Sequence, residues 1–260
     1  MNDQERFVRE FHRRRAGVTA AAYGRSRSYA VIVRAVGGAQ GRLADLGCGD
    51  GHLLAELRAA GFAGAMVGLD LSEAELAAAR ARGTGATLVQ ARAQALPVRD
   101  GAFDVVVSHL AFTLMSDVDD VVRELARVIA PGGRFITLVG GGPRGDDAFA
   151  GFLELARPLV RGVPRLGDLR ARSDRGLATL FTADAGWREL AIDDVPIDLS
   201  GTPDEVWQTM AGAYELAGVS DAERVSLHRS FTSAAARWRR DDGAVACTMA
   251  TRLVQVTRSG

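Results

Sequence analysis

The sequence predicts an α/β protein built on a doubly wound, mostly parallel seven-stranded sheet with its last strand antiparallel and with helical cap insertions. Short apolar runs alternate with amphipathic stretches of helical spacing through residues 43–139. A glycine-rich turn follows the first of these runs, and acidic or polar residues follow the later ones. The chain has 260 residues, 47% of them hydrophobic, which is enough to bury the core of such a sheet.

The first half of the chain alternates strands and helices. Residues 1–35 read as helical, with apolar faces around Phe7 and Phe11 and again from Tyr29 onward. Pro131, Gly132 and Gly133 end the last helix of this half, because proline and glycine do not continue a helix. The expected strands are 42–46, 65–70, 86–90, 103–108 and 134–139, and the expected helices lie near 51–60, 73–82 and 117–129.

The second half is expected to build a cap over the sheet edge. Residues 190–197 read as the sixth strand, and 247–256 alternate apolar and polar residues, as suits a last, antiparallel strand. Two helical insertions flank the sixth strand, where a cap over the site would be built. The expected cap helices are 148–160, 176–185 and 203–239.

The central motif runs from Leu43 to Leu57 and reads as strand, tight turn and helix. Glycine occupies every second position of the turn (Gly47, Gly49 and Gly51), which lets the backbone approach a ligand closely. The turn also opens a helix N-terminus, which attracts a carboxylate or a phosphate. The next strand ends on Asp70, nineteen residues after Gly51, and an acid at about that distance binds ribose hydroxyls in nucleotide-binding βαβ units.

An acid before the glycines indicates which nucleoside is bound. Asp45 stands two residues before Gly47, and the glycine spacing is tighter than the dinucleotide fingerprint. The Asp45 carboxylate would repel a pyrophosphate and attract an ammonium group. S-adenosylmethionine has that ammonium group, a sulfonium and a ribose, and it has no phosphate.

The Leu43–Leu57 motif resembles motif I of the class I S-adenosylmethionine-dependent methyltransferases. Residues 94–97, 100–108 and 123–135 are similar to the family's later signatures in order and spacing. The resemblance implies S-adenosylmethionine as the cofactor. It also implies three segments: 1–36, an N-terminal helical segment covering the site; 37–142, the cofactor-binding α/β core; and 143–260, cap helices interleaved with the last two sheet strands.

The resemblance assigns roles to residues that follow four strands. Asp45 would bind the amino group, and the glycines would let backbone pass beneath the methionine portion. Asp70 would bind the ribose hydroxyls, and the Ser108 carbonyl would lie near the sulfonium. Many relatives carry an aspartate where this chain has Arg92, so we expect backbone and packing to hold the adenine. The expected cofactor-binding residues are Asp45, Gly47, Cys48, Gly49, Gly51, Asp70, Leu71, Ala93, Gln94 and Ser108.

His109 is the candidate catalytic residue, because it follows the fourth strand beside the expected methyl position. Three roles stay open for it: a general base near pH 7, a residue that positions the substrate, or neither. For Phe112, Trp207 and Tyr214, core packing competes with pocket lining, since an apolar stripe at helical spacing suits both. The four histidines are scattered without metal-ligand spacing, so no metal site is expected. The expected substrate-binding residues are His12, Tyr23, Phe112, Trp207 and Tyr214.

The expected function is methyl transfer to a small organic metabolite, at O, N or C, in line and mainly through proximity. The alternative is a protein of the same fold that binds S-adenosylmethionine without transferring methyl. A formal net charge of +0 and Ser108-His109-Leu110-Ala111 in place of the Asn/Asp-Pro-Pro-aromatic motif argue against nucleic acid. Two cysteines, no membrane-length apolar run and no signal peptide favour a cytoplasmic monomer or homodimer without a membrane partner.

Overall fold

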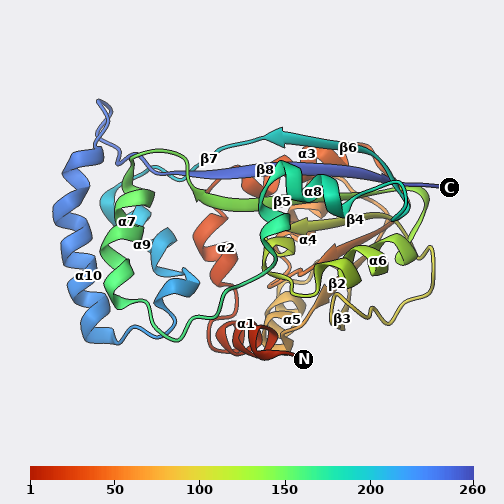
Figure 1. Ribbon diagram of the computed structural model, residues 1–260, viewed down its shortest axis with the longest axis horizontal. Coiled ribbons are helices and arrows are strands. Elements are labelled where there is room, and N and C mark those ends of the chain that lie inside the picture. The colour runs from red at the N-terminus through yellow and green to blue at the C-terminus, as the bar shows by residue number, and fades with distance from the viewer.

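One twisted sheet of eight strands organises the computed structural model, which describes residues 1–260 (Figure 1). The strand order is β3-β2-β1-β4-β5-β8-β6, and the two-residue β7 pairs with β8 beside this path. Strands β1 to β5 are parallel, whereas β8 is antiparallel to both β5 and β6. The predicted fold class is therefore confirmed. The strands are β1 Arg42–Leu46, β2 Ala65–Asp70, β3 Thr87–Gln90, β4 Phe103–His109, β5 Ile129–Pro143, β6 Trp187–Asp194, β7 Ile197–Asp198 and β8 Thr248–Arg258.

Helices cover both faces of the sheet because alternate strand residues point to opposite sides. On β4, Val105 and Val107 join a buried cluster that includes residues of α3 and α4, whereas Val106 joins a second cluster with α6. The first cluster continues into the cap through Phe152 and Phe231, so the sheet and the cap share one apolar core. The helices that flank the sheet are α3 Ser28–Val36, α4 His52–Ala59, α5 Glu73–Arg82 and α6 Val118–Val128.

Two strands differ from their predicted bounds by three residues or more, and β3, β4 and β8 differ by one or two. The fifth begins at Ile129, which pairs with Phe103, and a register shift absorbs the proline-glycine turn that follows. The sixth begins at Trp187, three residues earlier than expected, because the buried Trp187 ring packs edge-on against Phe181 at 5.4 Å between centroids. Pro196 lies beyond the strand end and has no N–H for the ladder. The short β7 was not predicted.

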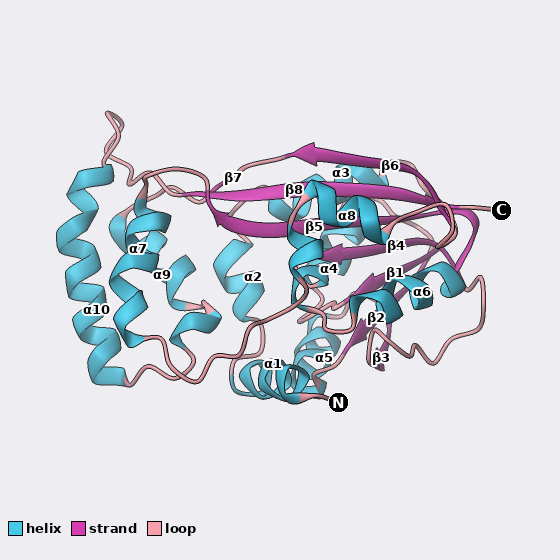
Figure 2. Cartoon of the chain, in the orientation of Figure 1, coloured by secondary structure: helices cyan, strands magenta, loops and turns pink.

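The cap is mostly helix and loop (Figure 2). The expected helical stretch 203–239 is two α-helices with short 3₁₀ turns, because α9 and α10 each begin with a capping box. Thr202 pairs with Glu205 at the first start, and Ser220 pairs with Glu223 at the second. The helices of the N-terminal segment and the cap are α1 Asp3–Arg14, α2 Val18–Tyr23, α7 Ala148–Ala156, α8 Asp174–Leu180, α9 Pro203–Ala211 and α10 Asp221–Ala234.

The carboxyl ends of the parallel strands face the cap. In Figure 2 the arrowheads of β1 and β4 point toward the side where α2, α9, α7 and α10 lie. Helix α1 crosses below this edge and contacts α5. A ligand bound at the carboxyl edge would therefore lie between the sheet, the N-terminal helices and the cap.

Candidate functional site

A cavity of about 630 Å³ lies at the carboxyl edge of β1, β2 and β4. Its wall combines the ends of these strands with side chains from α1, α2, α7 and α9. Hydrophobic residues make up 24 of its 47 lining residues, so it suits a ligand with both apolar and polar parts. Open α/β sheets bind ligands at this edge, and the cavity is therefore the candidate active site.

The turn after β1 brings backbone to the cavity. Gly47 has φ +74°, and a Cβ there would lie 2.4 Å from the Cβ of Ala111, so only glycine fits. The N–H groups of Gly47 and Cys48 both donate to the Leu69 carbonyl, at 2.7 and 3.1 Å, which ties the turn to β2. Gly47, Cys48 and Gly49 line the cavity, as expected.

Gly51 and Ser108, which were expected to bind the cofactor, do not line the cavity. Gly51 faces α5, where an added Cβ would lie 3.1 Å from the Cβ of Ala79, so it serves the close packing of α4 on α5. Ser108 is fully buried, and its hydroxyl donates to the Leu46 carbonyl at 2.8 Å. The Ser108 carbonyl, expected beside the sulfonium, instead accepts the Thr137 hydroxyl at 2.9 Å.

Asp45 is a buried carboxylate without a partner. It lines the cavity near the end of β1, is 1% exposed, and neither of its oxygens has a hydrogen bond. Burial raises the pKa of Asp45 well above its usual range, and the carboxylates of Asp70 and Asp50 raise it further. An unpaired buried carboxylate costs folding free energy, so this position suits a cationic group of a ligand.

Asp70, at the end of β2, is partly satisfied by backbone. Its Oδ2 accepts the Gly49 N–H at 2.9 Å and its Oδ1 accepts the Ser72 N–H at 2.8 Å. Burial raises the pKa of Asp70, against the lowering effect of these two hydrogen bonds. Each carboxylate oxygen can accept a second hydrogen bond, and a ligand hydroxyl is a suitable donor. The expected residues Leu71, Ala93 and Gln94 line the same cavity.

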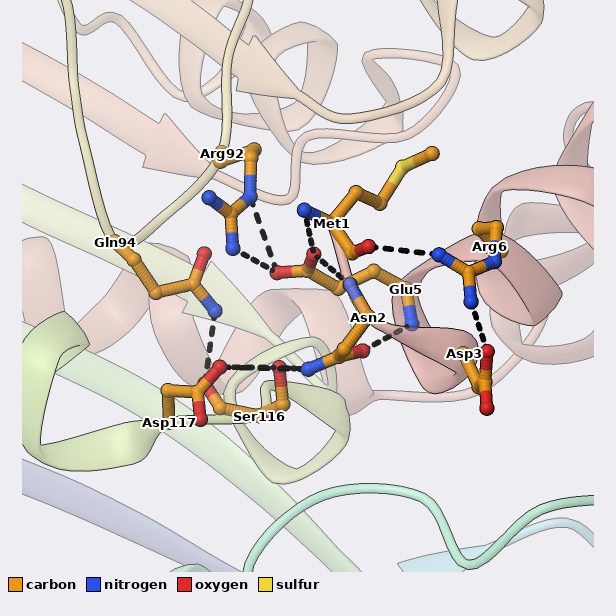
Figure 3. Close-up of polar contacts among 9 residues, drawn as sticks. All are labelled: Met1, Asn2, Asp3, Glu5, Arg6, Arg92, Gln94, Ser116 and Asp117. Atoms are coloured by element: carbon orange, nitrogen blue, oxygen red, sulfur yellow. Dashed lines mark hydrogen bonds and ion pairs between the residues drawn. The ribbon is translucent and has the colours of Figure 1, made fainter.

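Glu5, on α1, belongs to the site although sequence reasoning missed it. It is 7% exposed and lines the cavity, and its Oε1 lies 2.9 Å from Nη2 of Arg92 (Figure 3). Asn2 donates its amide to the Ser116 hydroxyl at 2.8 Å, and Gln94 donates to the Ser116 carbonyl at 2.8 Å. The start of α1 thus closes over Arg92 and Gln94. The Asn2–Glu5 capping-box spacing predicts a helix start, but no local pattern predicts the pairing with Arg92.

His109 lines the cavity and is packed against Tyr29. It is 6% exposed, its ring stacks on Tyr29 at 3.8 Å between centroids, and its Nε2 lies 2.9 Å from the Ser28 hydroxyl. Burial lowers the pKa of His109 to about 3, and the nearby His52 lowers it further. The imidazole is therefore neutral and weakly basic near pH 7. The low pKa disfavours the general-base role, which stays a prediction together with the positioning role.

Phe112 and Trp207 are also corrected, because both lie in the core outside the cavity lining. Phe112 is fully buried and packs on Phe135 at 5.5 Å between ring centroids. Trp207 is 8% exposed and stacks on His228 at 4.5 Å. Their helical stripe faces the neighbouring elements, so packing accounts for their apolar character.

His12, Tyr214 and Tyr23 do line the cavity. Nδ1 of His12 lies 2.6 Å from Oε1 of Glu75, and Nε2 lies 2.6 Å from the Tyr214 hydroxyl. Glu75, on α5, is 2% exposed and was not predicted, because its position in a helical pattern resembles that of any surface acid. Burial raises the pKa of Tyr23 to about 12, and Glu215 contributes to the increase.

Two arginines of the cap segment 160–172 line the same cavity without a carboxylate partner. Nη2 of Arg172 donates to the carbonyls of Leu166 at 3.1 Å and Thr113 at 3.5 Å, and its Nε is buried without a partner. Arg165 is exposed at the cavity margin. These cations lie beside the residues that follow β4, whereas Asp45 and Asp70 end β1 and β2. The cavity lining therefore contains cations from the cap segment as well as the carboxylates of β1 and β2.

Known proteins share both the sequence pattern and the fold. Residues 44–137 match the family described as "Methyltransferase domain". A malonyl-[acyl-carrier protein] O-methyltransferase of Geobacter sulfurreducens is 30% identical over 208 residues, which cover 75% of this chain and 74% of the relative. A demethylmenaquinone methyltransferase of Thermus thermophilus is 40% identical over 101 residues, which cover 37% of this chain and 46% of the relative.

The matches differ in how much they cover. The chain spans less than half the length of the first curated relatives, at 46% and 38%. Among solved structures, the YcgJ protein from Bacillus subtilis is similar with a TM-score of 0.60 and 20% identity, over 90% of this chain and 99% of that one. The similarity to this last protein shows a shared fold only.

None of the helices is both long and apolar enough to cross a membrane.

Proposed function

Because the chain belongs to the class I S-adenosylmethionine-dependent methyltransferases, we propose that it binds this cofactor in the cavity and transfers its methyl group to a small organic acceptor. The observation that carries the proposal is the unpaired Asp45 carboxylate. A protein keeps such a group only where something compensates it, and the amino-acid ammonium group of the cofactor would do so. A diphosphate beside Asp45 and Asp70 would add charge of the same sign.

The remaining cofactor contacts follow from the neighbouring strand ends. Asp70 would accept the ribose hydroxyls on oxygens that already accept two backbone N–H groups. Leu71 and Ala93 would contact the adenine. The Glu5–Arg92 pair would close α1 over it, and Glu5 would then supply a carboxylate at the position where the family resemblance leads us to expect an aspartate.

The cofactor, when bound, supplies a methyl group that a sulfonium has already activated. The contribution of the protein is then mainly to orient the acceptor and to exclude water. Helices α1 and α2 and the cap enclose the cavity, so an acceptor bound there is held close to the cofactor. Oxygen, nitrogen and carbon acceptors all suit this arrangement.

The acceptor that we propose is an organic molecule with an apolar body and an anionic group. Phe149, Leu153 and Leu166 line the cavity with apolar surface, and Arg165 and Arg172 supply two cations without carboxylate partners. The relatives are named for different acceptors, malonyl-[acyl-carrier protein] and demethylmenaquinone, so the acceptor is inferred from this cavity.

Calorimetry with S-adenosylmethionine and S-adenosylhomocysteine tests the binding step, and NADH serves as the control dinucleotide. Methyl-labelled S-adenosylmethionine and a panel of acceptors test the transfer step. The panel pairs hydroxybenzoic acids with their esters and adds a malonyl thioester and a naphthoquinol. We expect both nucleosides to bind and NADH not to bind. We expect the acceptors that carry a free carboxylate to take up more label than their esters.

Binding without label transfer to any acceptor would instead favour the alternative, a protein of this fold that binds the cofactor and does not transfer methyl. Failure of both nucleosides to bind, with binding of NADH, would contradict both readings.

A further inference from the structure

Three side chains in the cavity wall are linked by hydrogen bonds, although their elements are far apart in sequence. His12 comes from α1, Glu75 from α5, and Tyr214 from the short 3₁₀ helix Tyr214–Leu216 after α9. Both contacts of the imidazole are 2.6 Å long. All three residues line the cavity. These hydrogen bonds therefore connect a buried carboxylate, Glu75, to the Tyr214 phenol in the cavity.

The hydrogen bonds of Glu75 determine which atom donates in each hydrogen bond of this series. Oε2 of Glu75 accepts the Gly17 N–H at 2.9 Å, and Oε1 accepts from Nδ1 of His12. A neutral imidazole with its proton on Nδ1 has a free lone pair on Nε2. The Tyr214 hydroxyl then donates to Nε2, and its own oxygen lone pairs are available to a molecule in the cavity.

Packing holds the Tyr214 ring in place. Its centroid lies 4.4 Å from that of Phe11 and 6.4 Å from that of Phe7, so two aromatic rings pack against the phenol. Burial raises the pKa of Tyr214, and Asp70 and Glu75 raise it further. The phenol is therefore a weak acid on its own, and His12 is the group that can take its proton.

The other titratable groups of the cavity are unsuited to this task. His109 is a neutral, weakly basic imidazole stacked on Tyr29. Asp45 and Asp70 face the proposed cofactor. The groups around His12 and Tyr214 are Glu75 and Asp70 on the sheet side and Tyr23 and Glu215 on the cap side, and none of them is a cation.

We propose that Tyr214, His12 and Glu75 form a proton relay that accepts the proton of the methyl acceptor. This inference rests on the proposed methyl transfer. As the acceptor oxygen or nitrogen bonds to the methyl carbon, the sulfur–methyl bond breaks and its electron pair stays on sulfur. The acceptor proton moves to the Tyr214 oxygen, the Tyr214 proton moves to Nε2 of His12, and Glu75 stabilises the resulting imidazolium.

The tautomer of His12 tests the relay without any substrate. The ligand-free protein is labelled with ¹⁵N-histidine, and the His12 signals are assigned by their loss in His12→Gln. We expect neutral His12 to carry its proton on Nδ1, and Tyr214→Phe to shift the Nε2 resonance. A proton on Nε2 would overturn the relay even if methyl transfer is detected.

Kinetics test it with the acceptor that takes up most label in the panel described above. General-base catalysis contributes about 10²- to 10⁴-fold, so His12→Gln and Tyr214→Phe are each expected to lower kcat about 100-fold or more with little change in KM. Both variants should also lose the acid limb of the pH–rate profile. His228→Gln is the matched control, because His228 lies on α10 outside the cavity and should keep wild-type kinetics.

Glutamine at position 12 can keep the hydrogen bonds but cannot take a proton. Wild-type kcat in His12→Gln would therefore reduce His12 to a positioning residue and overturn the relay. If no acceptor in the panel takes label, the proposed function fails, and the tautomer measurement still decides whether the Tyr214–His12–Glu75 relay exists. If a variant does not fold, the tautomer measurement on the wild-type protein still decides whether the relay exists.

Discussion

Two buried carboxylates lie in the same cavity and differ in every contact they make. Asp45, near the end of β1, is 1% exposed and has no hydrogen-bond partner. Glu75, at the start of α5, is 2% exposed and has a partner on each oxygen, His12 and the Gly17 N–H. Burial alone therefore does not distinguish them. The state of their oxygens does.

The difference indicates two kinds of site. The end of β1 keeps an uncompensated carboxylate, Asp45, which suits a cationic group that arrives with a ligand. The region at the start of α5 is complete within the protein, which suits a device that is assembled before the ligand binds. Removing charge from the first region should cost affinity and increase stability, whereas removing it from the second should cost stability.

Asp45→Asn has the largest expected effect. Loss of one member of a buried charge pair costs about 2–5 kcal/mol, so affinity for S-adenosylhomocysteine should fall about 100-fold. The unfolded-state pKa of Asp45 is lower than its raised folded-state pKa, so its ionisation destabilises the fold as pH rises from the first value to the second. Asp45→Asn should therefore raise the Tm of the ligand-free protein at pH 7.

Calorimetry and thermal unfolding measure these two changes, and Asp184→Asn, at an exposed position, is the control. If Asp45→Asn loses affinity and also lowers the Tm, Asp45 is part of the structural framework. That result would contradict the distinction between Asp45 and Glu75.

Glu75→Gln should act in the opposite sense. A hydrogen bond to a charged group is worth about 1.5–3 kcal/mol, so the free energy of unfolding in urea should fall by about 2 kcal/mol at pH 7. Glu73→Gln is the matched control two residues away, because Glu73 is exposed and pairs only with Arg80. Its effect should stay within about 0.5 kcal/mol. Equal effects of the two variants would contradict the distinction.

The pH dependence of stability tests a third buried group. The folded-state pKa of His109 is about 3, below its ordinary value of 6.5, so folding excludes its proton. The contribution of neutral His109 to the free energy of unfolding is fully present above pH 6.5. It is lost as pH falls toward 3, at about 1 kcal/mol for each pH unit. His109→Gln should flatten this part of the profile of unfolding free energy against pH, whereas His228→Gln should leave it unchanged.

Arg92→Gln has the smallest expected effect. Its ion pair with Glu5 is half-exposed on the Arg92 side, at 39%, and pairs of this kind contribute about 1 kcal/mol or less. Stability should hardly change, whereas affinity for S-adenosylhomocysteine should fall about 3-fold if α1 closes over the adenine. An unchanged affinity would confine Glu5 and Arg92 to holding α1 in place.

Local patterns were sufficient for the parallel core. The bounds predicted for β1, β2 and α5 agree with the structure, because apolar runs, glycines and helix caps act within a few residues of each other. The cap was harder to predict. One expected helix over 203–239 is two, and the capping boxes at Thr202 and Ser220 were the available signal. For Trp207 and Phe112, core packing and pocket lining both stayed open, because an apolar stripe does not say which neighbour it faces.

The sequence by itself determined the α/β core, the glycine turn and the acids at the ends of β1 and β2, since each depends on the order of neighbouring residues. Tertiary structure alone decided which of these groups find partners. His12, Glu75 and Tyr214 are up to 202 residues apart, and Glu5 and Arg92 are 87 apart, so no local pattern records their contacts. Burial at those contacts, and not residue type, decides which carboxylate is compensated and which is left for a ligand.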